Sequence, residues 1–85
     1  MQLRVFVTLK PSVLDPQGMT IRKALHTLGF ERVEDVRQGK YFEIEWDGPL
    51  SGEEDRTRVE RMAAEVLSNP VIEGYRIEWP DEGVL

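Results

Sequence analysis

Strict alternation of apolar and polar residues over positions 2–9 is the feature that most constrains the fold. Leu3, Val5 and Val7 occupy odd positions, and the residues between them are mostly polar. A period of two is typical of a strand with one buried face. Phe6 interrupts the polar side. We expect either an isolated exposed aromatic residue or part of an intermolecular face there.

Two helices are predicted after this strand. A stiff loop, 10–18, contains two prolines and leads into a helix over 20–28, for which Thr20 is the expected N-cap. Ser51 and Glu54 fit a capping box at the start of the second helix. Apolar residues at helical spacing mark the two stripes that these helices would bury. They are Ile21, Ala24, Leu25 and Leu28 in the first helix, and Val59, Met62, Ala63, Val66 and Leu67 in the second.

Two further extended segments complete the pattern. Residues 40–46 and 71–79 alternate as strands do, whereas 33–46 reads either as one bent strand or as two. The order β-α-β-(β)-α-β predicts an α+β, ferredoxin-like sandwich in which both helices lie on one face of an antiparallel sheet. The length is that of a single domain, 1–85, with one modest core.

The other face of this sheet would be open. Phe6, Tyr41 and Trp46 are the aromatic residues that we expect on it. Several aromatic rings on an open face exceed what a small monomer normally exposes. In addition, a domain of this size gains stability from association. The sequence therefore predicts a dimer formed through the sheet.

Composition excludes several classes of function. The chain has no cysteine, which rules out a disulfide, a thiolate nucleophile and a zinc–thiolate site, and favours a cytoplasmic location. The net charge of −5 and the lack of clustered Lys and Arg argue against nucleic acid as a partner. No apolar run is long enough to span a membrane, and Met1 leads directly into the strand pattern without a signal peptide.

Residues typical of catalysis are also missing from the pattern. His26 is the single histidine and has no acid or nucleophile at helical spacing, so we interpret it as a surface or boundary residue. Neither a phosphate-binding loop nor a dinucleotide-binding glycine motif follows the first strand. Adjacent acidic residues lie in turns and helix starts, where they interact favourably with the helix dipole and increase solubility. We expect no catalysis by the isolated chain.

Three blocks of the sequence resemble a known family. The longest runs from Leu9 to Gly18 (Leu-Lys-Pro-Ser-Val-Leu-Asp-Pro-Gln-Gly), and the others are 35–40 and 69–76. In this order and spacing they resemble PurS, the small subunit of bacterial phosphoribosylformylglycinamidine (FGAM) synthase. The resemblance covers nearly the whole chain.

The resemblance implies a role in the fourth step of de novo purine synthesis, in which formylglycinamide ribonucleotide is converted to the amidine with ATP and glutamine. In that family, PurQ is the glutaminase and PurL the ATP-dependent synthetase, so the resemblance implies no cofactor in this chain. The resemblance to PurS further implies that this chain forms a homodimer, possibly a tetramer. This assembly would bridge the two other subunits and help ammonia to pass between them.

Surface residues near the first loop are the candidates for binding such partners. They are Lys10, Pro11, Val13, Leu14, Asp15 and Gln17, with Arg37 and Lys40 as a second set. The alternative for Val13 and Leu14 is that they close one end of the core.

Two other functions fit the predicted fold. One is a stand-alone, small-molecule-binding regulatory dimer of the ACT type, although the first loop of such sensors is typically short and rich in glycine. The other is an RNA-binding module, which the acidic charge and the missing basic, aromatic strand motif disfavour.

Overall fold

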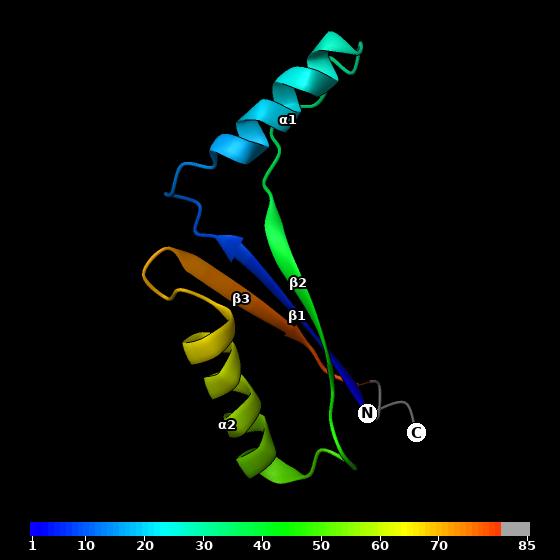
Figure 1. Ribbon diagram of the computed structural model, residues 1–85, viewed down its shortest axis with the longest axis vertical. Helices are drawn as coiled ribbons and strands as arrows, with labels where there is room; N and C mark the ends of the chain where they lie inside the picture. Colours follow the sequence, from blue (N-terminus) through cyan, green and yellow to red (C-terminus); the bar gives the residue numbers. More distant parts are fainter. Residues whose placement is uncertain (81–85) are drawn as a thin grey trace.

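Three antiparallel strands form the sheet, with the N-terminal strand in the middle (Figure 1). The structure is a computed structural model that describes residues 1–80. Its elements are β1 (Gln2–Leu9), α1 (Pro16–Thr27), β2 (Gly39–Glu45), α2 (Gly52–Met62), the π-helical turn η1 (Ala63–Leu67) and β3 (Glu73–Glu78). The sheet order is β2-β1-β3. This confirms the predicted α+β class, with the last strand beside the first as in a ferredoxin-like sheet.

The core lies between one face of the sheet and α2 with η1. Leu3, Val5 and Val7 of β1 are fully buried and pack with Val59 and Ala63 of the helical layer. Because side chains alternate along a strand, this face is set by the odd positions of β1. The predicted alternation over 2–9 is therefore confirmed.

The first helix does not cover the sheet, contrary to our prediction. Figure 1 shows α1 projecting beyond the end of the strands, and Gly18 is its one buried residue. Residues 33–38 form no strand, so 33–46 contains the single strand β2. The rule that places a crossover helix on the sheet applies to parallel strands, whereas β1 and β2 are antiparallel neighbours. Their connection is free to leave the sheet.

The ends of α1 follow two different rules. Asp15 is the N-cap and Pro16 the first helical residue, so the expected N-cap Thr20 was wrong. Proline suits this position because its missing N–H is needed least there. At the other end Gly29 has a φ of 99°, and Phe30 N–H donates to the carbonyl of Leu25. This is the Schellman motif that ends many helices.

The second helix changes its pitch at η1. A π-helical turn holds more residues than an α-helical one, so the side chains after it rotate away from the predicted stripe. Val66 is 75% exposed as a result, while Leu67 still packs against the core. At the start of α2, Ser51 N–H donates to Asp55 Oδ2 at 3.0 Å, and thus Asp55 takes the place of the expected Glu54.

Between residues 1 and 80, neither helix has the length and the apolar character that a membrane span requires. Residues 81–85 lie outside the described part of the chain.

Candidate functional site

A narrow neck joins α1 to the sheet. We define the neck as residues 10–18, where the chain leaves β1, and 36–40, where it returns to β2. The guanidinium of Arg37 donates from Nη2 to the carbonyls of Lys10 and Val13, at 3.0 Å each. This side chain was a candidate for contacting a partner. In the structure its hydrogen bonds hold the loop of its own chain in shape, and the side chain itself stays exposed.

Asp15 ties the two halves of the neck together and is 4% exposed. Its Oδ1 accepts the N–H of Gly18 at 2.9 Å, and its Oδ2 accepts the N–H of Gln38 at 2.7 Å. These hydrogen bonds, that of Gly18 first, hold the pKa of the Asp15 carboxyl below its ordinary value. Gly18 lies so close to the carbonyl of Val36 that a side chain there would collide with it. The neck is therefore tightly fitted.

A third segment joins the neck at the end of the sheet. The N–H of Lys10 donates to the carbonyl of Ile72 at 2.8 Å, and Lys40 Nζ lies 3.4 Å from Glu73 Oε2. The turn 69–73 is closed by hydrogen bonds to Asn69. All three blocks that carried the family resemblance thus meet at one end of the sheet, where α1 begins to project.

This junction exposes aliphatic side chains. Leu14 is 69% exposed and Val71 is 78% exposed, whereas Val13 is half-buried. Leu14 therefore does not close the core, which was the alternative interpretation of the loop. Lys10, Pro11 and Gln17 are exposed as well. The structure brings the two predicted sets of residues together beside the turn of Val71. The prediction of Asp15 as a partner contact was wrong, because its side chain is buried in the neck.

The open face of the sheet carries a cluster of rings and ion pairs. The Phe6 and Tyr41 ring centroids are 5.0 Å apart, and the Arg76 guanidinium lies 4.3 Å from the centroid of Phe6. Burial, and then the hydrogen bond to Glu43, raises the pKa of the Tyr41 hydroxyl. The placement of Trp46 on this face was wrong. Trp46 packs against the core cluster on the covered side, because it and Tyr41 fall on opposite sides of β2.

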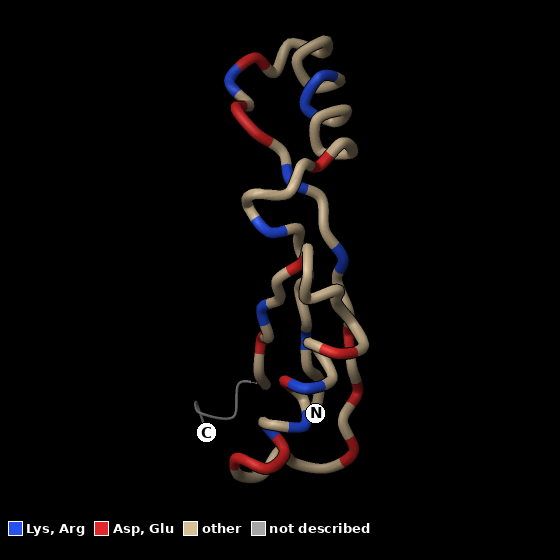
Figure 2. Tube along the Cα trace, turned by 90° about the vertical axis from the view of Figure 1, so that its left-hand side faces the viewer, with Lys and Arg blue, Asp and Glu red and all other residues tan. Residues whose placement is uncertain are grey.

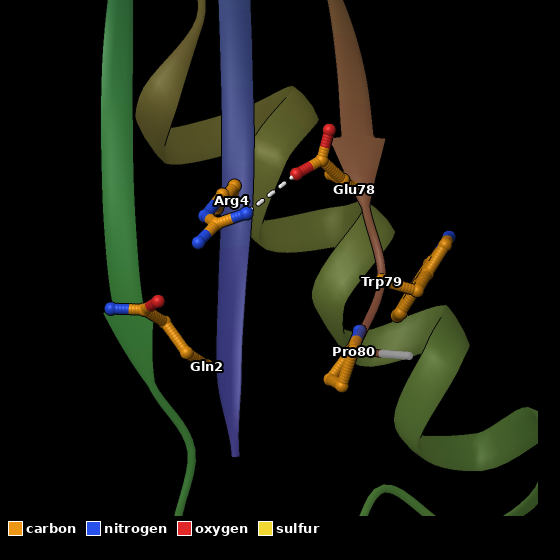
Figure 3. Close-up of a pocket in the computed structure, with 5 residues that line it drawn as sticks. All are labelled: Gln2, Arg4, Glu78, Trp79 and Pro80. Atoms are coloured by element: carbon orange, nitrogen blue, oxygen red, sulfur yellow. Dashed lines mark hydrogen bonds and ion pairs between the residues drawn. The ribbon is translucent and has the colours of Figure 1, made fainter. Parts of the chain in front are cut away.

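A shallow hollow lies at one end of this open face (Figure 3). Gln2, Arg4, Glu78, Trp79 and Pro80 line it. Arg4 Nη1 and Glu78 Oε1 are 2.9 Å apart, and this pairing raises the pKa of Arg4 and lowers that of Glu78. The charged groups thus neutralise each other, which leaves the hollow without a free acid or base for catalysis.

The remaining features that could indicate chemistry in the described residues are a metal site, a catalytic histidine and a charged binding surface. No group of His, Asp and Glu side chains within residues 1–80 is arranged to hold a metal ion. His26 Nε2 contacts the carbonyl of Val33 at 2.7 Å, which draws the segment after α1 back onto the helix. Figure 2 shows basic and acidic segments interspersed along the trace of the described residues.

Comparison with known proteins decides the family. The sequence matches the family described as PurS, phosphoribosylformylglycinamidine (FGAM) synthase, over residues 2–81. The chain belongs to the PurS family. The PurS subunit of Bacillus subtilis (strain 168) is 43% identical over 77 residues, which are 91% of this chain and 89% of that subunit.

Solved PurS structures share the fold. The chain resembles B. subtilis PurS in its C2 crystal form with a TM-score of 0.77 and 42% identity, covering 91% of this chain and 94% of the other. It also resembles a chain in the structure of PurLQS from Thermotoga maritima, with a TM-score of 0.78, 28% identity and coverage of 91% and 93%. The predicted resemblance is confirmed, and it decides against the ACT-type alternative.

Sequence reasoning missed one residue of the junction. Val71 was assigned to a strand, but it lies in the turn before β3. An apolar residue directly after Asn69-Pro70 was the available signal, because such a dipeptide marks a turn.

Proposed function

We propose that this chain is the non-catalytic subunit that joins a PurL-type synthetase to a PurQ-type glutaminase in FGAM synthase, a ligase. The related PurLQS structure of T. maritima supports such an assembly. In the proposed complex the partner subunits use ATP and glutamine, and this chain supplies only binding surfaces. We place the complex in the cytoplasm, with residues 1–85 acting as one PurS-like domain.

The observation that carries the proposal is the exposure of Leu14 and Val71 on a rigid junction. Both side chains are more than two-thirds exposed. The backbone around Leu14 is fixed by the hydrogen bonds of Arg37 and Asp15, and the turn that carries Val71 is closed by hydrogen bonds to Asn69. Apolar side chains that stay exposed on a fixed backbone cost little entropy to bury against a partner. The junction therefore suits docking, with Lys10, Pro11 and Gln17 at its rim.

The expected mechanism is positional. Ammonia released by a glutaminase escapes into bulk water unless the synthetase lies close by. Holding the two active sites together raises the local concentration of ammonia, which is a proximity effect and needs no acid or base from this chain. The subunit would then assist ammonia transfer without touching the reacting atoms.

We further propose that the chain forms a homodimer, possibly assembling into a tetramer, with Phe6 and Tyr41 on the paired sheets. The open face supports this proposal because it carries aromatic rings together with charged groups of both signs. Such a face can complement the same face of a second copy. Replacing Tyr41 by Glu is expected to weaken this contact.

The docking surface is tested by Leu14→Glu, with Val66→Glu as the matched control. Both side chains are aliphatic and similarly exposed, at 69% and 75%, but Val66 lies on η1 and belongs to neither segment of the neck. Each variant is mixed with the synthetase and glutaminase subunits of the organism from which this chain comes. Assembly is then measured by light scattering after gel filtration. We expect Leu14→Glu to abolish assembly and Val66→Glu to leave it unchanged.

Two rates of FGAM formation then test the role in ammonia transfer. Leu14→Glu is expected to lower the glutamine-dependent rate at least tenfold, while the rate with added ammonium salt, which needs only the synthetase, stays within twofold. An unchanged glutamine-dependent rate would refute the docking surface. An equal loss with both ammonia sources would refute the transfer role.

A further inference from the structure

The connection between β2 and α2 contains the one Asp–Gly pair of the sequence, Asp47-Gly48. Both residues are exposed, and Figure 1 shows this connection at the end of the sheet opposite α1. Such a pair marks a turn, because glycine accepts backbone angles that other residues resist. Gly48 uses this freedom, with a φ of 79°. The pair is also chemically reactive, since glycine has no side chain to keep its nitrogen away from the preceding carboxyl carbon.

The groups that would react have no partners within residues 1–80. The N–H of Gly48 donates to no backbone carbonyl there, and the Asp47 carboxylate belongs to none of the ion pairs between described residues. A Cβ built on Gly48 would meet no atom within 4 Å, so the space beside its nitrogen is open. The turn therefore lets the nitrogen and the carboxyl carbon approach each other.

We propose that Asp47-Gly48 is a site of spontaneous isoaspartate formation. The Gly48 nitrogen attacks Cγ of Asp47 and forms a C–N bond, and the carboxyl oxygen leaves with the amide proton as water. Water then opens the resulting succinimide ring. Attack at Cγ restores aspartate, whereas attack at the main-chain carbonyl carbon breaks its bond to the nitrogen and leaves the chain running through the former side chain. The two steps release and take up one water molecule and need no other reactant.

The product lengthens the backbone between two side chains of the core. Trp46 packs against the cluster of Leu3 and Val59, and Leu50 belongs to that cluster with 8% of its surface exposed. Residues 47–49 alone separate these two anchors. An isoaspartyl residue inserts one methylene group into this short span, and a densely packed core adapts poorly to such a change. The modification therefore weakens the core at this end of the sheet.

The backbone on either side of the span is held in place. The N–H of Trp46 donates to the carbonyl of Met1 at 2.8 Å. On the other side, the N–H of Ser51 donates to Asp55 Oδ2 at 3.0 Å at the start of α2. The added length must then displace Leu50 or break the hydrogen bond of Ser51. Either change costs folding stability.

Asp35 provides a matched comparison within the same chain. It is also exposed, lies outside the helices and strands, and belongs to none of the ion pairs between described residues. Its neighbour Val36 carries a branched side chain, which hinders the approach of the Val36 nitrogen. Asp15 cannot react in this way, because Pro16 has no N–H. The proposal thus singles out Asp47.

The first experiment follows ring opening by isotope uptake. The full-length chain is kept for several weeks at physiological temperature in water enriched in heavy oxygen, and is then digested with trypsin in ordinary water. Cleavage after Lys and Arg places Asp47 in the peptide 41–56 and Asp35 in the peptide 33–37. Each ring opening adds one heavy oxygen atom, and electron-transfer fragmentation locates both the label and the isoaspartyl residue. We expect on the order of tenfold more of both at Asp47 than at Asp35, because branching hinders Val36.

Two variants at the same position test the chemistry. Asp47→Glu keeps the negative charge, but its longer side chain closes a ring far more slowly, so the label at this position should be lost. Asp47→Asn should react faster than the original chain, because its amide leaves as ammonia. Equal labelling of Asp47 and Asp35, or unchanged labelling in Asp47→Glu, would overturn the proposal.

The second experiment tests the effect on the core. The isoaspartyl chain is separated from the unmodified chain by ion-exchange chromatography, and both are unfolded in urea. We expect the folding equilibrium constant of the isoaspartyl chain to be roughly 5- to 30-fold smaller, while aged and fresh Asp47→Glu unfold alike. Isoaspartate at position 47 with unchanged unfolding would refute its effect on the core. Neither experiment involves the partner subunits, so the result is independent of the proposed function.

Discussion

Asp15 accepts a hydrogen bond from the backbone of Gln38 at 2.7 Å, although the two residues are 23 positions apart. The same carboxylate caps the first turn of α1 through Gly18. One side chain therefore fixes both where the helix begins and where the chain returns to the sheet. A change in the charge of Asp15 therefore affects both the first turn of α1 and the backbone at Gln38.

The contribution of Asp15 to stability should depend on pH. Its pKa is lowered in the folded chain, so the contribution is complete above the ordinary value of about 3.9 and is lost as the pH falls through the lower, folded value. Urea unfolding should show Asp15→Asn to be less stable than the original chain at pH 7, with the difference shrinking steadily below about pH 4. Glu60→Gln, on the exposed side of α2, is the control. A difference that is constant from pH 7 to pH 2 would contradict this assignment.

Gly18 should tolerate no side chain. An added Cβ would collide with the carbonyl of Val36 and would lie 2.9 Å from Asp15 Oδ2. We expect Gly18→Ala to lower the free energy of unfolding by about 1–3 kcal/mol, as overpacking does. Gly74→Ala is the control, because nothing lies within 4 Å of a Cβ there. Equal stability of the two variants in thermal unfolding would show that the neck can widen.

Arg37 should control the rigidity of the loop. Arg37→Gln removes the donors to the carbonyls of Lys10 and Val13. Native-state hydrogen exchange should then be roughly three- to tenfold faster at the Val13 amide, which donates within this loop to Lys10. Arg58→Gln on α2 should leave that rate unchanged. Unaltered exchange in Arg37→Gln would mean that the loop keeps its shape without the guanidinium.

The core should respond as a single packed layer. Leu3 is fully buried with Leu50 and Val59, so Leu3→Ala should cost about 2–5 kcal/mol of unfolding free energy. Val66→Ala removes an exposed side chain, and surface substitutions of this kind usually stay within about 0.5 kcal/mol. Denaturant unfolding of both variants checks this. A loss below about 1 kcal/mol for Leu3→Ala would contradict the burial of Leu3.

Local rules predicted the parts of this fold that local physics decides. The alternation through Leu3, Val5 and Val7 identified both the central strand and its buried face. The end of α1 was predicted within one residue of Thr27, and it is followed by Gly29, whose left-handed backbone only glycine adopts without strain. The start of α1 was predicted four residues too late, because Pro16 after Asp15 is itself a favoured beginning of a helix.

Local rules did not predict the direction of α1, nor which apolar side chains of the helices are buried and which are exposed. Nothing within the stripe of Ile21 and Leu28 tells whether it covers its own sheet or another surface. That choice depends on Arg37 and Asp15, which act across a long stretch of sequence. The exposure of Val66 follows from the π-helical turn, which breaks the 3.6-residue period on which the prediction relied.

The central position of β1 has a consequence for how the chain is made. The first strand to be synthesised pairs with β2 on one edge and with β3 on the other. Its second partner is the last element described, so one edge of β1 stays bare until residues 73–78 have been added. Pairing between such distant segments also slows folding, because a long loop must close before any contact forms. A nascent chain that stalls after α2 is thus the form most prone to aggregation.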